Sequence, residues 1–269
     1  MSIKIVFSDI DGTFLTNDHR VTEHTQRTVK SLLSKGIPFV LVSARMPEAI
    51  YPITQSIGVT IPIISYSGGL VLTEKEQVLY SRELTETDCR HVLTDIEEHW
   101  PEVTVNYYAG RHWYVRQIDS RVQTEMDITS AQAEPADFDE LMDRGILPNK
   151  ILIMADPPVC EEMEQKLGVR FPGLNVVRSA PMLLEIMDRS VSKATGIEVM
   201  LKHFGWTADE ALAFGDNYND TEMLQYVGCG VAMKNAPDAI RALADEVTET
   251  NENDGIYVCL RKKGLIPAE

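Results

Sequence analysis

Residues 3–13 read IKIVFSDIDGT, and this stretch predicts the architecture of the chain. The run Ile3–Phe7 does not alternate between polar and apolar side chains, which indicates a strand buried on both faces. Asp9 and Asp11 follow it at once. In an open parallel sheet, ligands bind beyond the carboxyl ends of the strands, so both carboxylates would face a crevice. On its own, Asp-Gly is also ordinary turn chemistry.

The same alternation of apolar runs and helical patterns recurs towards both ends of the chain. Further strands are expected at Ile37–Val42, Ile61–Ile64, Ala211–Phe214 and Val231–Met233. Helices are expected after the N-cap Thr22, from Pro47, over Ser192–His203, over Asp220–Tyr226 and from Pro237. Strands alternating with helices imply right-handed crossovers. The predicted fold class is therefore α/β, with a doubly wound, mostly parallel sheet.

The middle of the chain has a different pattern. Apolar residues alternate with polar ones around Val103–Tyr107 and Trp113–Val115, and the intervening Ala109–Arg111 is a candidate hairpin turn. This pattern predicts an α+β domain, residues 82–186, inserted into an α/β core made of residues 1–81 and 187–269.

The composition is that of a folded, acidic protein. Hydrophobic residues make up 44% of the chain, and 41 acidic against 25 basic residues give a net charge of −16. Such a chain repels the phosphate backbone, so neither nucleic acid nor an anionic membrane is an expected partner. Four cysteines lack zinc-site or redox-motif spacing and are expected to be reduced thiols: Cys89, Cys160, Cys229 and Cys259. With no signal segment or apolar run of about 20 residues, the expected location is cytoplasmic.

Three further groups follow the same structural logic as the first aspartates. Ser43–Arg45 follows one expected strand, residues 215–220 (GDNYND) follow another, and Lys193 begins an expected helix. All would converge at one edge of the sheet. A cluster of carboxylates without histidine or cysteine suits Mg²⁺, which prefers hard oxygen ligands and often meets a substrate phosphate.

These positions carry a family resemblance. Residues 9–13 (DIDGT), Ser43, Lys193 and residues 215–220 match, in order, the four motifs of haloacid dehalogenase superfamily phosphatases. The inserted domain resembles the large α+β cap of the Cof-type sugar-phosphatase branch. Two more stretches are similar to that branch, residues 230–236 (GVAMKNA) and 253–255 (NDG).

Two positions depart from the family pattern. Ala44 stands where the family usually has glycine after the motif-two hydroxyl, and Ser67-Gly68 stands where Asn-Gly commonly enters the cap. Both departures bear on the fine geometry around the substrate and leave the acidic residues intact.

The resemblance implies a phosphatase that hydrolyses small phosphorylated metabolites, sugar phosphates in particular. Asp9 would be the nucleophile that forms an aspartyl-phosphate, and Asp11 the general acid and base. Mg²⁺ would be held by Asp9, the backbone carbonyl of Asp11, and Asp216. The remaining implied roles are phosphate binding by Gly12, Ser43 and Lys193, and support by Thr13, Arg45, Asn219 and Asp220.

Two other functions and one structural alternative stay open at this point. A phosphomutase of the phosphomannomutase type uses two similar aspartates, and a non-enzymatic sensor of phosphorylated ligands could use the same pocket. In the inserted domain, residues 107–116 are rich in aromatic and basic side chains. Arg111 and Trp113 are candidates for substrate specificity, whereas the alternative is cross-strand packing in a hairpin.

Overall fold

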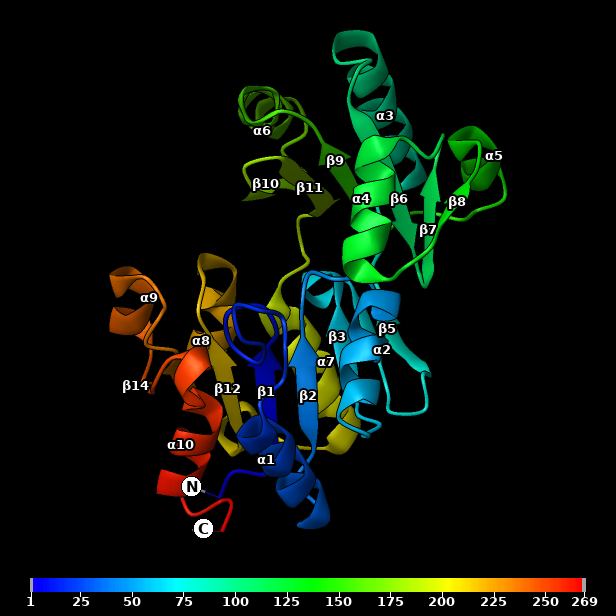
Figure 1. The fold of residues 1–269 in the computed structure, drawn as a ribbon. Coiled ribbons are helices and arrows are strands. Elements are labelled where there is room, and N and C mark those ends of the chain that lie inside the picture. The colour runs from blue at the N-terminus through cyan, green and yellow to red at the C-terminus, as the bar shows by residue number, and fades with distance from the viewer. Residues whose placement is uncertain (1, 268–269) are drawn as a thin grey trace. The chain divides into compact units, whose positions relative to one another are not determined.

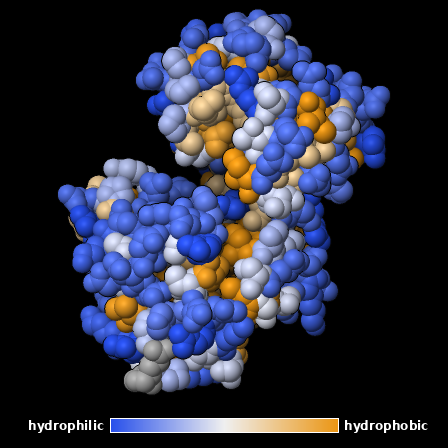
Figure 2. All heavy atoms as spheres, viewed as in Figure 1, coloured by the Kyte–Doolittle hydropathy of each residue, from blue (hydrophilic) through white to orange (hydrophobic). Residues whose placement is uncertain are grey.

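The computed structural model describes residues 2–267. Two compact units make up the fold (Figure 1): the first consists of residues 1–45, 50–80 and 192–269, and the second of residues 46–49 and 81–191. Each unit contains one sheet. Hydrophilic side chains cover much of the face seen in Figure 2. Among the described residues, no helix has both the length and the apolar character needed to cross a membrane.

The sheet of the first unit is mostly parallel. Its eight strands lie in the order β14-β13-β12-β1-β2-β3-β4-β5, and the run from β14 to β3 is parallel, whereas β4 is antiparallel to β3. The strands are β1 (Ile5–Asp9), β2 (Phe39–Val42), β3 (Ile63–Ser65), β4 (Leu70–Leu72), β5 (Val78–Ser81), β12 (Ala211–Gly215), β13 (Cys229–Ala232) and β14 (Glu246–Val247).

Helices cover both faces of this sheet (Figure 1). They are α1 (Glu23–Ser34), α2 (Pro47–Ser56), α7 (Lys193–Phe204), α8 (Thr221–Tyr226), α9 (Asp238–Leu243) and α10 (Gly255–Lys262), with 3-10 turns η1 (Tyr66–Gly68), η2 (Ala208–Glu210), η3 (Tyr218–Asp220) and η4 (Asn251–Asn253). The predicted N-cap of α1 is confirmed, because the Thr22 side chain accepts a hydrogen bond from an N–H group of the first turn. Ser192, expected as the first residue of its helix, caps α7 in the same way. Helix α7 ends at Gly205, whose φ of +69° is the left-handed conformation that glycine adopts readily.

Strand register brings the ends of three strands to one edge. Asp9, the last residue of β1, pairs with Val42 of β2, and Ser8 pairs with Phe214 of β12. The residues that follow β1, β2 and β12 therefore emerge side by side. Alternate residues of β1 and β2 pack against α7 and α8 in one buried hydrophobic cluster. The strands that end at this edge are therefore fixed by the core.

The second unit is an α+β domain. Its six strands lie in the order β10-β11-β9-β6-β7-β8, mostly antiparallel. Its elements are α3 (Glu86–His99), β6 (Thr104–Ala109), β7 (His112–Val115), α4 (Ser120–Thr129), β8 (Ala133–Pro135), α5 (Phe138–Asp143), β9 (Lys150–Met154), α6 (Pro157–Arg170), β10 (Leu174–Ala180) and β11 (Leu183–Asp188). The predicted fold class, a mostly parallel α/β sheet with an inserted α+β domain, is confirmed.

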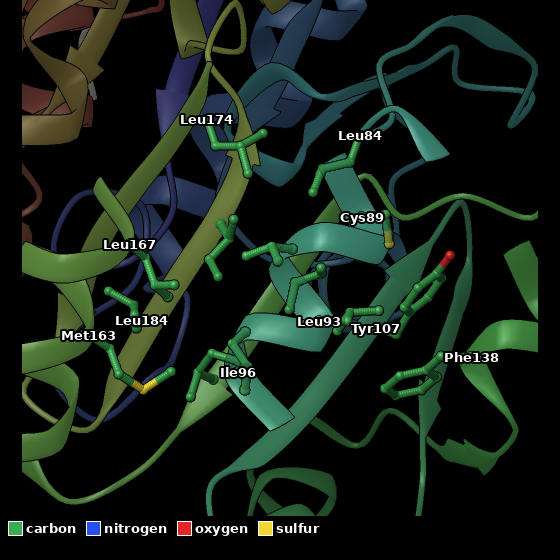
Figure 3. Packing of buried hydrophobic residues seen from close by; sticks show 14 of the residues in the cluster. Leu84, Cys89, Leu93, Ile96, Tyr107, Phe138, Met163, Leu167, Leu174 and Leu184 are labelled. Atoms are coloured by element: carbon green, nitrogen blue, oxygen red, sulfur yellow. The ribbon is translucent and has the colours of Figure 1, made fainter. Parts of the chain in front are cut away.

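The core of the second unit lies between its sheet and helices α3, α5 and α6. Figure 3 shows Leu93 of α3 close to Tyr107 of β6, with Phe138 beside the tyrosine ring. The rings of Tyr107 and Phe138 stack with their centroids 5.0 Å apart. Strands β6 and β7 form the predicted hairpin, and Gly110 takes a φ of +59° at its turn.

Candidate active site

A buried lysine joins two carboxylates at the edge where β1 and β12 end. The ammonium of Lys193, the first residue of α7, donates to Asp9 Oδ1 and, over 2.5 Å, to Asp220 Oδ1. The three residues are buried, with Lys193 1% exposed. They come from segments as far as 184 residues apart in the chain, so the tertiary fold brings them together.

One ammonium shared by two carboxylates sets the electrostatics of this cluster. Burial disfavours the charged form of Lys193, but Asp220 and Asp9 outweigh it and hold the pKa of the ammonium above its ordinary value. Burial also raises the pKa of Asp9 well above the usual range; Lys193 opposes this rise and the negative charge of Asp220 adds to it. The cluster thus disfavours a second full negative charge on Asp9 beside Asp220, and a bound cation would favour that charged form.

Asp220 also shapes the loop that follows β12. Its second oxygen, Oδ2, accepts hydrogen bonds from the backbone N–H groups of Asp216 (2.8 Å) and Asn217 (3.0 Å). A side chain at Gly215 would place its Cβ 2.6 Å from the Asp220 Cβ, so the close turn needs glycine there. Asp220 consequently fixes both Lys193 and the backbone of Asp216.

Asp216 lies against the loop that follows β1. Its Oδ1 accepts a hydrogen bond of 2.7 Å from the Thr13 hydroxyl. Gly12 has a φ of +81°, and a Cβ at this position would lie 2.3 Å from Asp216 Oδ2, so glycine permits the contact. Burial raises the pKa of Asp216 to about 6, although the hydrogen bond from Thr13 opposes the rise.

Three carboxylates of this edge are close enough to bind one ion. Asp9, Asp216 and Asp220 each offer one oxygen, and the three oxygens lie within 4.8 Å of one another. Oxygen donors without nitrogen or sulfur fit Mg²⁺. The structure thus brings together two of the residues expected to hold the metal, Asp9 and Asp216, and adds the carboxylate of Asp220, for which only a supporting role was expected.

The Asp11 carboxylate lies in a different setting. Arg45 donates to both of its oxygens, over 2.9 Å from Nε and 2.6 Å from Nη2, and His19 Nδ1 lies 3.6 Å from Asp11 Oδ1. The Asp11 side chain is 46% exposed, whereas that of Asp9 is 10% exposed. Two aspartates only two residues apart therefore differ in solvation and in counter-ion.

Ser43 and Asn219 complete the set of expected residues in the first unit. Ser43 directly follows β2, is buried, and its hydroxyl accepts a hydrogen bond of 3.1 Å from the backbone N–H of Arg45. Asn219 is exposed, and within residues 2–267 its side chain makes no hydrogen bond. Nothing in the described structure ties Asn219 to the carboxylate cluster.

Two asparagines contact this site although the sequence analysis assigned them no role. Asn235 donates to the carbonyl of Gly12 over 2.8 Å, and Asn251 donates from its backbone N–H to Asn235 Oδ1 over 3.2 Å. Asn235 lies within residues 230–236, one of the stretches similar to the Cof-type branch. That similarity was the signal that could have marked Asn235.

The two candidate specificity residues of the second unit differ in their surroundings. Trp113 is 1% exposed, its Nε1 donates to Asn106 Oδ1 over 2.9 Å, and its ring stacks on Tyr108. Arg111 is 43% exposed and pairs with Glu48, with 2.8 Å between Nε and Oε1. Glu48 lies in the first turn of α2, and residues 46–49 group with the second unit although the rest of α2 belongs to the first. The structure therefore places Trp113 as an interior packing residue and leaves Arg111 at the surface.

The chain is similar to known proteins over nearly its whole length. Residues 6–260 match the family model of the haloacid dehalogenase-like hydrolases. A Haemophilus influenzae protein that carries the provisional name of a phosphatase is 37% identical over 264 residues, which is 98% of this chain and 99% of the relative. The 5-amino-6-(5-phospho-D-ribitylamino)uracil phosphatase YitU of Bacillus subtilis is 27% identical over 263 residues, covering 96% of each chain.

A solved structure has the same fold over nearly the whole chain. A haloacid dehalogenase-like hydrolase from Bacteroides thetaiotaomicron superimposes with a TM-score of 0.87 at 28% identity, covering 97% of this chain and 100% of the other.

Proposed function

This chain belongs to the haloacid dehalogenase-like hydrolase family, and from that premise we propose that it is a magnesium-dependent phosphatase of small phosphorylated metabolites, with sugar phosphates as its substrate class. The observation that carries the proposal is the cluster in which Lys193 joins Asp9 to Asp220 beside Asp216. Binding a phosphate alone needs no nucleophile. The names of the two relatives, one of which acts on a phosphoribityl compound, support hydrolysis.

Asp9 is the proposed nucleophile. Lys193 holds its Oδ1, so Oδ2 is the oxygen that would attack phosphorus in line. The new bond joins Oδ2 to phosphorus as the bond from phosphorus to the ester oxygen breaks, which gives an aspartyl-phosphate and an alcohol. Asp9 is buried, and this burial raises its pKa. The same burial limits the access of bulk water to the reacting oxygen.

Asp11 is the proposed acid and base. It would give its proton to the leaving oxygen, then take a proton from the water that hydrolyses the aspartyl-phosphate. Its greater exposure suits a group that meets both the leaving alcohol and water. The two donors of Arg45 hold the orientation of this carboxylate, so Arg45 acts as a positioning residue.

Mg²⁺ would be held by Asp9 and Asp216, together with the backbone carbonyl of Asp11. When bound there, it neutralises negative charge on the phosphoryl group and on the carboxylates. Thr13 and Asp220 orient Asp216 for this purpose, through its side chain and its backbone N–H. Lys193, the Ser43 hydroxyl and the backbone N–H of Gly12 are the proposed donors to the phosphoryl oxygens, on which negative charge is spread in the transition state.

We assign substrate selection to the inserted domain, expected at residues 82–186, because the residues of the chemical steps all lie in the first unit. Arg111 remains a candidate contact for the part of the substrate that is not phosphate, since it is a cation at the surface. Contacts of this kind raise specificity without taking part in bond breaking.

A phosphate-release screen tests the proposal. The purified chain is incubated with phosphorylated sugars, polyols, nucleotides and p-nitrophenyl phosphate, with Mg²⁺ and with a chelator. We expect inorganic phosphate to appear only with Mg²⁺, fastest from a sugar or polyol phosphate. A positional isomer of the sugar phosphate without free phosphate would identify a mutase, and binding without any turnover would identify a sensor.

A further inference from the structure

Three segments that are far apart in the sequence meet at Asn235 in the first unit. Asn235 follows β13, Gly12 lies 223 positions before it, and Asn251 of η4 lies 16 positions after it. The residue is exposed, a setting in which an asparagine amide usually bonds to water. Here, instead, both ends of the amide are bonded to backbone groups.

The amide nitrogen of Asn235 is directed at the metal-binding edge. It donates to the carbonyl oxygen of Gly12 over 2.8 Å and lies 3.5 Å from Asp216 Oδ2. The other oxygen of Asp216 accepts the hydrogen bond from Thr13. The Asp216 carboxylate is therefore bounded on one side by Thr13 and on the other by Asn235, with Gly12 between them.

The amide oxygen of Asn235 is held in turn by Asn251. The backbone N–H of Asn251 donates to it over 3.2 Å. The Asn251 side chain is buried and donates to the carbonyl of Leu15 over 2.9 Å and to Asn17 Oδ1 over 3.2 Å. The two asparagines thus make three hydrogen bonds to the loop that follows β1, and two of these reach backbone carbonyls.

We propose that Asn235 is a positioning residue that sets the Asp216 carboxylate and the Gly12 backbone for metal binding, and that Asn251 holds Asn235 in place. This inference rests on the proposed magnesium site. Removing a residue that orients a metal ligand typically lowers metal affinity or activity by about 10- to 100-fold. Asn235 touches a proposed ligand directly, whereas Asn251 acts through Asn235, so Asn235 has the larger effect.

The test measures Mn²⁺ binding to the metal-free chain. Electron paramagnetic resonance detects the free ion, and the loss of its signal reports binding. The variants are Asn235→Ala and Asn251→Ala, with Asn253→Ala as the matched control. Asn253 is an exposed asparagine of the same η4 turn, and its backbone N–H bond to Thr250 survives the substitution. Melting curves without metal accompany each titration.

We expect Asn235→Ala to raise the Kd for Mn²⁺ about 10-fold, Asn251→Ala to raise it less, and Asn253→Ala to leave it unchanged. The lost turnover of Asn235→Ala should return when Mg²⁺ is raised by the same factor. A purely structural role predicts a lower melting temperature with unchanged Mn²⁺ affinity and no rescue by Mg²⁺, and that result overturns the inference. A wild-type chain that binds no Mn²⁺ overturns the magnesium proposal itself, and this inference with it.

Discussion

Each of the two units contains a buried lysine paired with carboxylate, and the two pairs differ in geometry. Lys193 lies between Asp9 and Asp220 at strand ends, with a contact of 2.5 Å to Asp220. Lys150 of β9 lies 3.4 Å from Glu185 and 5.4 Å from the centre of the Tyr108 ring. Glu185 pairs with Leu152 in the strand register, so Lys150 is its diagonal neighbour on the same sheet face.

The difference separates the proposed catalytic cluster from an ordinary cross-strand ion pair. Cross-strand neighbours of opposite charge are common in sheets, and such a pair needs only the sheet to form. The Lys193 cluster needs strand β1, the turn η3 after β12 and helix α7, which come from separate parts of the chain, and it places two carboxylates on one ammonium. Burial alone therefore does not distinguish the two lysines; the proposed catalytic one is the lysine whose partners come from separate segments of the chain.

The largest expected effect comes from replacing each lysine with methionine. Lys193→Met should abolish hydrolysis of p-nitrophenyl phosphate, because it removes a phosphoryl donor and the group that orients Asp9. Lys150→Met should keep that activity within a few-fold of wild type. Lys150→Met removes the cation from Glu185, and Lys193→Met removes it from both Asp9 and Asp220. Breaking one buried pair typically costs about 3–5 kcal/mol. Melting curves therefore accompany the assays, which are run below both transitions. Equal activity in the two variants would show that hydrolysis depends no more on Lys193 than on Lys150.

The next effect separates the two aspartates of the loop after β1. Asp11→Asn should slow an alkyl phosphate such as glucose 6-phosphate by roughly 10²–10⁴-fold, since this leaving group needs a proton. p-Nitrophenyl phosphate has a good leaving group and should lose far less. Single-turnover rates for both substrates provide the comparison. Equal losses on the two esters would remove Asp11 from the acid role.

Trp113→Ala tests the interior of the second unit against its surface. The indole is buried and bonded to Asn106, so its removal should cost about 3–5 kcal/mol of unfolding free energy. The order of preferred substrates should stay as in wild type. Arg111→Ala is the surface comparison: it should alter the substrate order with little change in melting. A reordered substrate profile in Trp113→Ala, without loss of stability, would contradict the packing role.

The smallest effect is the pH dependence of stability without metal. Asp216 has a pKa of about 6 in the folded chain, above the ordinary 3.8 of an aspartate, so folding favours its protonated form. The stability from this group is therefore complete below about pH 4 and is lost as the pH rises through about 6. Asp216→Asn should melt higher than wild type at pH 7.5 in chelator and equally at pH 4. A difference in melting temperature that persists at pH 4 would show that it does not arise from the ionisation of Asp216.

The placement of the candidate site in the first unit follows from local sequence patterns. Strands β1, β2 and β12 are short apolar runs, and Asp9, Ser43 and Asp216 stand just where these runs end, so a parallel sheet brings them to one edge. The motif resemblance to haloacid dehalogenase superfamily phosphatases is confirmed by the family model.

Contacts set by tertiary packing could not be read from the same patterns. Arg45 pairs with Asp11 across 34 residues, and Asn235 reaches Gly12 across 223, and no periodicity encodes such distances. Strands β4 and β5 were not predicted from the sequence. β4 has three residues and β5 has four, so neither shows a clear alternation of polar and apolar side chains. For Trp113, the sequence left packing and substrate contact open because aromatic residues favour strands in either case.

Chemical trapping of the covalent intermediate tests the central claim that Asp9 is the nucleophile. Enzyme quenched during turnover of a sugar phosphate is treated with borohydride, which reduces an aspartyl-phosphate to homoserine, and its peptides are analysed by mass spectrometry. We expect homoserine at position 9 in the presence of Mg²⁺ and substrate, and none in Asp9→Asn or with chelator. Steady phosphate release without any modification at position 9, or near wild-type turnover by Asp9→Asn, would contradict it.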